Sequence, residues 1–207
     1  MKKIVFPLML IVGLLVGTTS CKDKDIYPPM TGYWMCEGIG GTAFGATTPN
    51  IDSKYLAVFS VAYVGVLNGG YYTRVGAQDL TSVAGLASSL STHTGLSEQS
   101  WENYFSYGSF TVDEANQTVT HTLKNGEVET FYYEMPDETT LKLTTQSVSG
   151  TGNISGTANT VINVINAFLG DDKQISTNVG VVYTYKKKNV TEILSALKNI
   201  ASTSASE

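Results

Sequence analysis

Four short stretches of β-forming residues between residues 104 and 147 constrain the fold more than any other part of this 207-residue chain. Turn-forming segments at 113–116, 125–126 and 135–138 separate them. Such short connections join antiparallel neighbours, and valine, threonine and aromatic residues favour strands. The segment therefore predicts a four-stranded antiparallel meander, with strands at 104–112, 117–124, 127–134 and 139–146.

Asn125-Gly126 predicts how two of these strands pair, because Asn-Gly is typical of a two-residue hairpin turn. The face that carries the more apolar residues should then point inward. With a two-residue loop, the predicted pairs on that face are Leu123 with Val128, His121 with Thr130, and Val119 with Tyr132.

The remaining periodicity extends the meander into a barrel. Further strands are predicted at 32–39, 55–67, 70–75 and 179–187, and helices at 81–90, 97–103, 158–169 and 190–200. Asn189 and Glu192 have the spacing of a capping box in front of the last helix. We therefore predict a mainly β fold: an antiparallel up-and-down barrel of about eight strands, with a mid-chain and a C-terminal helix. It forms one domain, residues 30–200, followed by a polar tail, 201–207.

Residues 1–20 read as a targeting segment. Lys2 and Lys3 precede an apolar run at 4–16, which is shorter than the ~20 residues that span a bilayer. Small residues and Cys21 follow, as at a signal-peptide cleavage site. The pattern resembles bacterial lipoprotein precursors, although Thr18 departs from their usual leucine. The resemblance implies cleavage between Ser20 and Cys21 and acylation of Cys21; the alternative is an ordinary secretory signal.

Residues 21–29 would then be a tether, with a charged run at 22–25 and Pro28-Pro29. The run resembles the surface-export signals of some Gram-negative lipoproteins, and the alternative is a solvated spacer. We expect an outer-membrane, lipid-anchored protein that is exposed at the cell surface or faces the periplasm. Its membrane contact would be the N-terminal lipid.

Gly32 and Trp34 begin the first predicted strand. This G-x-W pattern resembles that of lipocalins and of lipocalin-like (calycin-type) domains in bacterial lipoproteins. The resemblance implies that Trp34 closes one end of the barrel beneath a cation from the last strand, here one of the lysines 186–188. The alternative is a core tryptophan in another β-sandwich.

A lipocalin-like barrel would hold one small apolar or amphipathic ligand among inward side chains. The candidate lining residues are Phe59 or Val58, Val119, His121, Tyr132 and Tyr183. His121 would orient a polar ligand atom; alternatively it is a half-buried residue bonded to Thr130 or to a tyrosine. A separate hypothesis places a glycan on exposed aromatics at Trp101, Tyr104 and Tyr107, unless these residues only build the sheet.

Composition excludes several other classes. The chain has 13 Lys+Arg, 18 Asp+Glu and a net charge of −5, without a basic cluster for nucleic acid. Two His and two Cys predict no metal site, and Cys36 reads as a core residue. Phosphate-binding and nucleophile motifs are absent, so no cofactor and no enzymatic activity are expected.

We therefore expect a lipid-anchored, lipocalin-like protein that binds a small ligand at the cell envelope. The alternative is a non-catalytic interaction module that binds a glycan or a partner protein on its outer face. Inward side-chain size distinguishes the two, because a row of large apolar residues across the barrel would leave no room for a ligand.

Overall fold

A computed structural model describes most of the domain. The described residues are 30–41, 51–66, 69–75, 83, 85–105, 107–123, 126, 128–145, 156–169 and 180–203. The predicted signal peptide, Cys21 and the tether lie outside them, and their assignments stay predictions.

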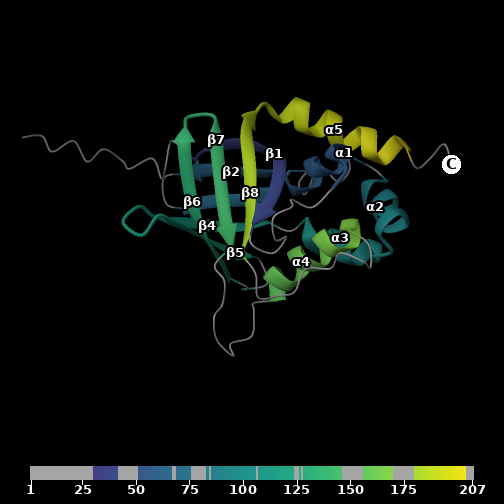
Figure 1. Cartoon of the computed structure of the whole chain (residues 1–207), viewed down its shortest axis with the longest axis horizontal. Coiled ribbons are helices and arrows are strands. Elements are labelled where there is room, and N and C mark those ends of the chain that lie inside the picture. The colour runs from purple at the N-terminus through teal and green to yellow at the C-terminus, as the bar shows by residue number, and fades with distance from the viewer. Residues whose placement is uncertain are drawn as a thin grey trace, which may run out of the picture.

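Eight antiparallel strands form a closed barrel in sequence order (Figure 1). This confirms the predicted fold class. The strands are β1 (Gly32–Gly41), β2 (Val61–Val66), β3 (Gly69–Arg74), β4 (Tyr107–Asp113), β5 (Thr118–Leu123), β6 (Val128–Asp137), β7 (Thr140–Thr145) and β8 (Val181–Lys188).

The first and last strands close the barrel. β1 pairs with β8 from Tyr33 opposite Lys188 to Gly41 opposite Val181, with a bulge between Cys36 and Gly38. β1 pairs with β2 over only three positions, from Gly32 to Trp34. The β1–β8 ladder is thus the longer of the two that hold β1 in the sheet, and it leaves neither terminal strand as an open edge.

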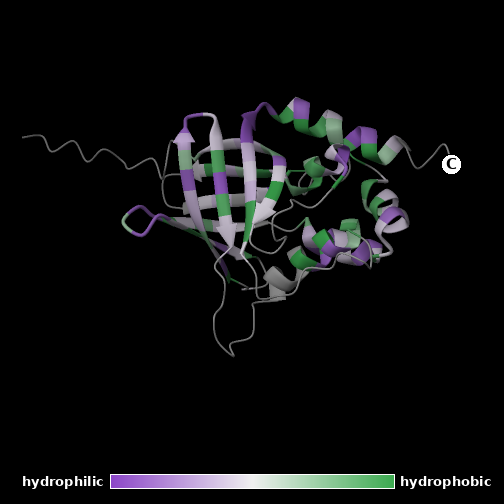
Figure 2. Ribbon diagram, viewed as in Figure 1, coloured by the Kyte–Doolittle hydropathy of each residue, from purple (hydrophilic) through white to green (hydrophobic). Residues whose placement is uncertain are grey.

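The barrel wall alternates between inward and outward residues, as a pleated strand requires. In β8, Val181, Tyr183 and Tyr185 are buried and the residues between them are partly exposed. The same alternation appears as apolar and polar bands along β6 and β7 in Figure 2. The inward residues join one hydrophobic core that continues beneath the helices.

Trp34 fills one end of the barrel, as the G-x-W resemblance implies. Its side chain is fully buried, and its indole N–H donates to the Met30 carbonyl at 2.7 Å. The Lys187 ammonium lies 5.3 Å from the ring centroid, the geometry of a cation–π contact. Gly32 has φ +138°, and a Cβ there would come within 2.9 Å of the Lys187 side chain. Glycine therefore fits both the backbone and the lysine.

Helices gather on one side of the barrel (Figure 1). They are α1 (Ser53–Leu56), the 3₁₀ helix η2 (Ala57–Phe59), α2 (Leu86–Thr94), α3 (Glu98–Tyr104), α4 (Gly156–Leu169) and α5 (Val190–Thr203). The predicted capping box of α5 is present: Glu192 N donates to Asn189 Oδ1 at 2.9 Å, and Asn189 N donates to Glu192 Oε2 at 3.1 Å.

The predicted strand at 55–67 is wrong over its first half. Asp52 caps α1 by accepting a hydrogen bond from Lys54 N at 3.1 Å, and the chain stays helical until Phe59. An apolar run without alternation fits a buried helix and a buried strand equally well, so its composition did not distinguish them. The predicted helix at 81–90 begins later, at Leu86, because Gly85 at its N-cap has φ +83°.

The predicted register of the β5–β6 hairpin is also wrong by one residue. Thr122 pairs with Val128, and His121 pairs with Glu129 rather than Thr130. Gly126 N donates to the Leu123 carbonyl at 2.8 Å, and Gly126 has φ +86°. The observed pairs are therefore offset by one residue from those of a two-residue loop, and the connection contains a left-handed glycine. A shift of one residue in register reverses the face of every β6 side chain.

Gly70 gives a test of the interior packing. A Cβ at Gly70 would lie 2.3 Å from Phe110 Cε1, inside the barrel. We expect Gly70→Ala to lower the free energy of unfolding by about 1–3 kcal/mol in urea denaturation, as overpacking does. Ser109→Ala, at the exposed neighbour of Phe110, should change it by less than about 0.5 kcal/mol. A Gly70→Ala variant as stable as the wild type would contradict this packing.

Candidate functional site

Large side chains occupy the barrel interior. Several of them are less than 2% exposed, although each points into the space where a lipocalin-like ligand would lie. The rings of Tyr63 and Phe110 meet edge to face with centroids 4.9 Å apart. The largest of these fully buried inward residues are Trp34, Tyr63, Phe110, Leu141, Leu143 and Tyr185.

Charged and polar groups lie among these rings. Arg74 and Glu129 are only 6% and 5% exposed. The Arg74 guanidinium stacks on the Tyr104 ring at 4.3 Å and donates to the Phe59 carbonyl at 3.4 Å. Burying such groups is costly unless they are paired or hydrogen-bonded. Neither residue was predicted to face inward. Glu129 does so only in the observed register, in which it pairs with His121.

His121 is fully buried rather than half-buried, and it is hydrogen-bonded to a tyrosine, as the second of its two interpretations predicts. Its Nε2 lies 2.9 Å from the Tyr63 hydroxyl. Burial, reinforced by the positive charge of Arg74, lowers the pKa of His121 from 6.5 to about 3. The imidazole is therefore neutral at physiological pH.

Tyr183 and Cys36 face the same interior. Among the described residues, the Tyr183 hydroxyl has no hydrogen-bond partner. Burial raises the pKa of Tyr183 well above 10 and that of the Cys36 thiol to about 12. Cys36 is therefore a buried, protonated thiol rather than a nucleophile, as expected from the sequence.

The structure brings together some of the predicted lining residues and separates one. Val119, His121 and Tyr183 are buried and point into the barrel. Tyr132 does not line the interior: it lies on the outer face and is 51% exposed, because the register differs by one residue. Phe131 takes its place inside.

Phe59 and Val58 lie in η2 rather than in a strand, and both are fully buried. Phe59 packs among aromatic residues at the end of the barrel that the helices cover. Its ring centroid lies 6.3 Å from Tyr104, 5.9 Å from Phe168 and 6.3 Å from Tyr183. These contacts connect α3, α4 and β8 in one cluster.

The predicted aromatic glycan platform is wrong for Trp101 and Tyr104. Both residues are buried beneath the helices, and the Trp101 ring lies 5.9 Å from Phe168. The side chain of Tyr107 lies outside the described residues. A stacking surface for sugars therefore cannot form on Trp101 and Tyr104.

The outer face of β4 to β7 carries an array of hydroxyl groups instead. We call it the hydroxyl face. Thr120 pairs with Thr111 on one side and Thr130 on the other, and Tyr132 lies between Thr118 and Thr144. The alternating threonines at 118, 120 and 122 were visible in the sequence. Which side chains of the neighbouring strands lie beside them depends on the strand register, and the predicted β5–β6 register was wrong. Its residues are Ser109, Thr111, Thr118, Thr120, Thr122, Val128, Thr130, Tyr132 and Thr144.

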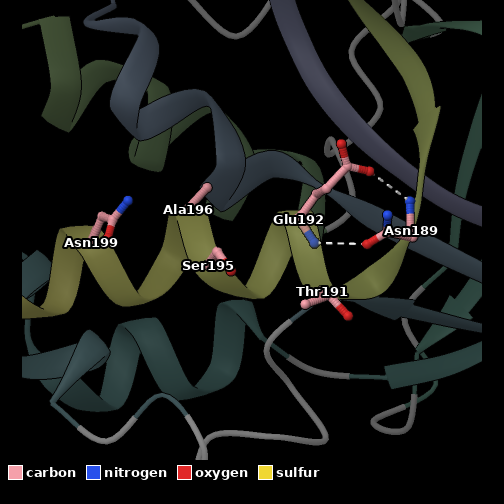
Figure 3. A pocket seen from close by; sticks show the side chains of 6 residues that line it. All are labelled: Asn189, Thr191, Glu192, Ser195, Ala196 and Asn199. Carbon is pink, nitrogen blue, oxygen red and sulfur yellow. Dashed lines mark hydrogen bonds between the residues drawn. The ribbon is translucent and has the colours of Figure 1, made fainter.

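A shallow depression on α5 is less promising as a site (Figure 3). It is lined by Asn189, Thr191, Glu192, Ser195, Ala196 and Asn199. The Asn189 and Glu192 side chains are bonded to backbone N–H groups of the helix start. The depression is therefore a mainly polar surface of the capped helix, in which the Asn189 and Glu192 side chains are already engaged.

In the described part of the chain, the helices are too short or too polar to cross a bilayer. Nowhere in it do three His, Cys, Asp or Glu side chains gather as a metal site would require. Searches against protein-family models, curated proteins and solved structures found no match to this chain.

The buried His121 predicts a pH-dependent stability. Its folded pKa of about 3 lies below the value of 6.5 in the unfolded chain, so the unfolded state binds a proton that the folded state excludes. Stability should therefore fall as pH decreases from about 6.5 towards 3, by up to ~1.4 kcal/mol per pH unit. Urea unfolding at pH 7, 6 and 5 measures this slope.

A matched pair of variants assigns the slope to His121. His121→Gln should flatten the decline between pH 6.5 and 5, whereas His93→Gln, at an exposed position of α2, should preserve it. An unchanged slope in His121→Gln would show that another group carries the effect.

Proposed function

We propose that this chain is an exported, lipid-anchored β-barrel that acts without catalysis as an interaction module at the cell envelope. The packed interior carries this proposal. The inward rings and leucines of the described strands are buried, and side chains of that size favour a barrel packed by its own residues over one that holds a ligand. A binding partner would then contact the outer surface of the barrel.

The N-terminal segment supports the location. A short apolar run, small residues and Cys21 resemble a lipoprotein signal, and eight residues lie between Cys21 and Met30, where the described domain begins. A tether of that length spans at most about 30 Å when extended. The barrel would thus stay close to the membrane that holds its lipid, facing the cell exterior or the periplasm.

A small-ligand carrier of the lipocalin type is the second candidate, and one observation favours it. Arg74, Glu129 and Tyr183 are buried polar residues inside the barrel, where an apolar core would be simpler. A small amphipathic ligand could use such groups if neighbouring side chains moved aside.

Changing Cys21 to serine tests the anchor. The wild-type chain should fractionate with membranes and carry the mass of attached acyl chains. Cys21→Ser should lose the acyl mass and leave the membrane fraction. Cys36→Ser, which removes the buried thiol, should remain acylated. Equal membrane association and mass for Cys21→Ser and wild type would refute lipid anchoring.

Native mass spectrometry of the mature protein, released from detergent, distinguishes the two candidates. For an interaction module we expect the mass of the acylated chain alone. Reproducible additional mass from one small molecule, lost on unfolding, would instead favour the carrier and contradict a filled interior.

A further inference from the structure

We propose that the hydroxyl face binds a neutral carbohydrate, with Tyr132 as its stacking residue. This inference rests on the proposed function, since it names the partner chemistry of an outward-binding barrel. Its basis is the combination, among the described residues of one wall of the barrel, of an exposed aromatic ring, in-register hydroxyl groups and few unpaired charges.

The exposed apolar residues of this wall lie on one strand. Val128 and Tyr132 are 47% and 51% exposed, and both project outward from β6 on either side of Thr130. An exposed tyrosine offers a flat apolar ring with a polar hydroxyl at its tip. Such a ring can pack against the C–H face of a pyranose while its hydroxyl bonds to the sugar.

Hydroxyl groups surround this ring on the neighbouring strands. The register places Thr118 and Thr144 directly beside Tyr132, and Thr120 beside Thr130. Thr120 Oγ1 and Thr130 Oγ1 lie 3.2 Å apart, within hydrogen-bond distance. Each threonine hydroxyl donates one hydrogen bond and accepts others, as sugar hydroxyls do. Strand pairing holds the backbones of neighbouring strands about 4.8 Å apart, which repeats these hydroxyl groups at a regular spacing across the sheet.

The charge distribution favours a neutral partner. On the outer face of these strands, Glu134 and Lys142 form an ion pair at 3.7 Å, which cancels their net charge. Asp113 is occupied by the β4–β5 turn, where it accepts hydrogen bonds from Ala115 N and Asn116 N. Among the residues of this wall that the structure describes, an acidic polymer or a nucleic acid would find no excess of positive charge. A protein interface of ordinary type would need a larger apolar centre than Val128 and Tyr132 provide.

The wall is also open. In Figure 1, β6 and β7 lie on the side of the barrel away from α1, α2 and α5. The outward residues of β6 and β7 are exposed or partly exposed rather than covered by a helix. Although α4 contacts β6, the described outward side chains of β6 are accessible to a glycan chain.

Affinity gel electrophoresis of the full acylated chain in detergent tests the inference. The gels contain neutral α-glucan, β-glucan or α-mannan, with polygalacturonate as the charged counterpart. We expect at least one neutral polysaccharide to retard the wild-type protein, and polygalacturonate to leave its mobility unchanged. Tyr132→Ala should weaken the retardation about fivefold or more, as loss of one stacking contact predicts.

Three further variants separate stacking from folding. Tyr132→Phe should retain most of the binding, and the double variant Thr120→Val, Thr130→Val should weaken it while preserving strand shape and β propensity. Tyr33→Ala removes another exposed tyrosine, on β1, and should bind like wild type. Circular dichroism and the fluorescence of the buried tryptophans confirm that each variant is folded.

The inference is overturned if none of the three neutral polysaccharides retards the wild type, or if Tyr132→Ala is retarded as strongly as wild type. Equal loss in Tyr33→Ala, or preferential retardation by polygalacturonate, also overturns it. These outcomes leave the interaction module intact with a protein partner. The proposed function fails separately, in the acylation and native mass experiments.

Discussion

The hydrogen-bonded pairing of β1 with β8 is the interaction on which the rest of the structure depends. It converts an antiparallel meander into a closed barrel and so defines an inside and an outside for every strand. Trp34 and Lys187 are register partners in that ladder, which is why the indole and its covering ammonium meet at one end. Without closure, β1 and β8 would expose unpaired backbone groups, and the interior rings would face solvent.

Because the barrel is closed, the register of each strand pair decides which side chains face the interior. Because side chains alternate, the one-residue shift in the register of β5 and β6 turns Glu129 and Phe131 inward and Tyr132 outward. The same change moves the Glu129 carboxyl group into the core and the Tyr132 ring onto the surface. The interior polar group at Glu129 and the candidate binding surface at Tyr132 are thus two consequences of a single register.

The sequence predicts the fold well where the physical signal is local. Alternation and turn residues located the meander, the capping box marked the start of α5, and Gly32 with Trp34 marked the start of the barrel. The signal was insufficient where two structures satisfy the same pattern: the apolar run at 55–67 suits helix and strand, and Asn-Gly occurs in two-residue and three-residue loops. Burial of Trp101 and Tyr104 depends on how α3 packs against the barrel, which local propensity does not encode.

The account as a whole depends on a closed barrel with a filled interior, and backbone hydrogen exchange measured by NMR tests the closure most directly. Amides in the β1–β8 ladder, such as those of Ile39 and Tyr183, should exchange as slowly as amides at the centre of β5, limited by global unfolding. Exchange of the β1 and β8 amides at the rate of exposed turns, while β5 stays protected, would show an open sheet and contradict the account.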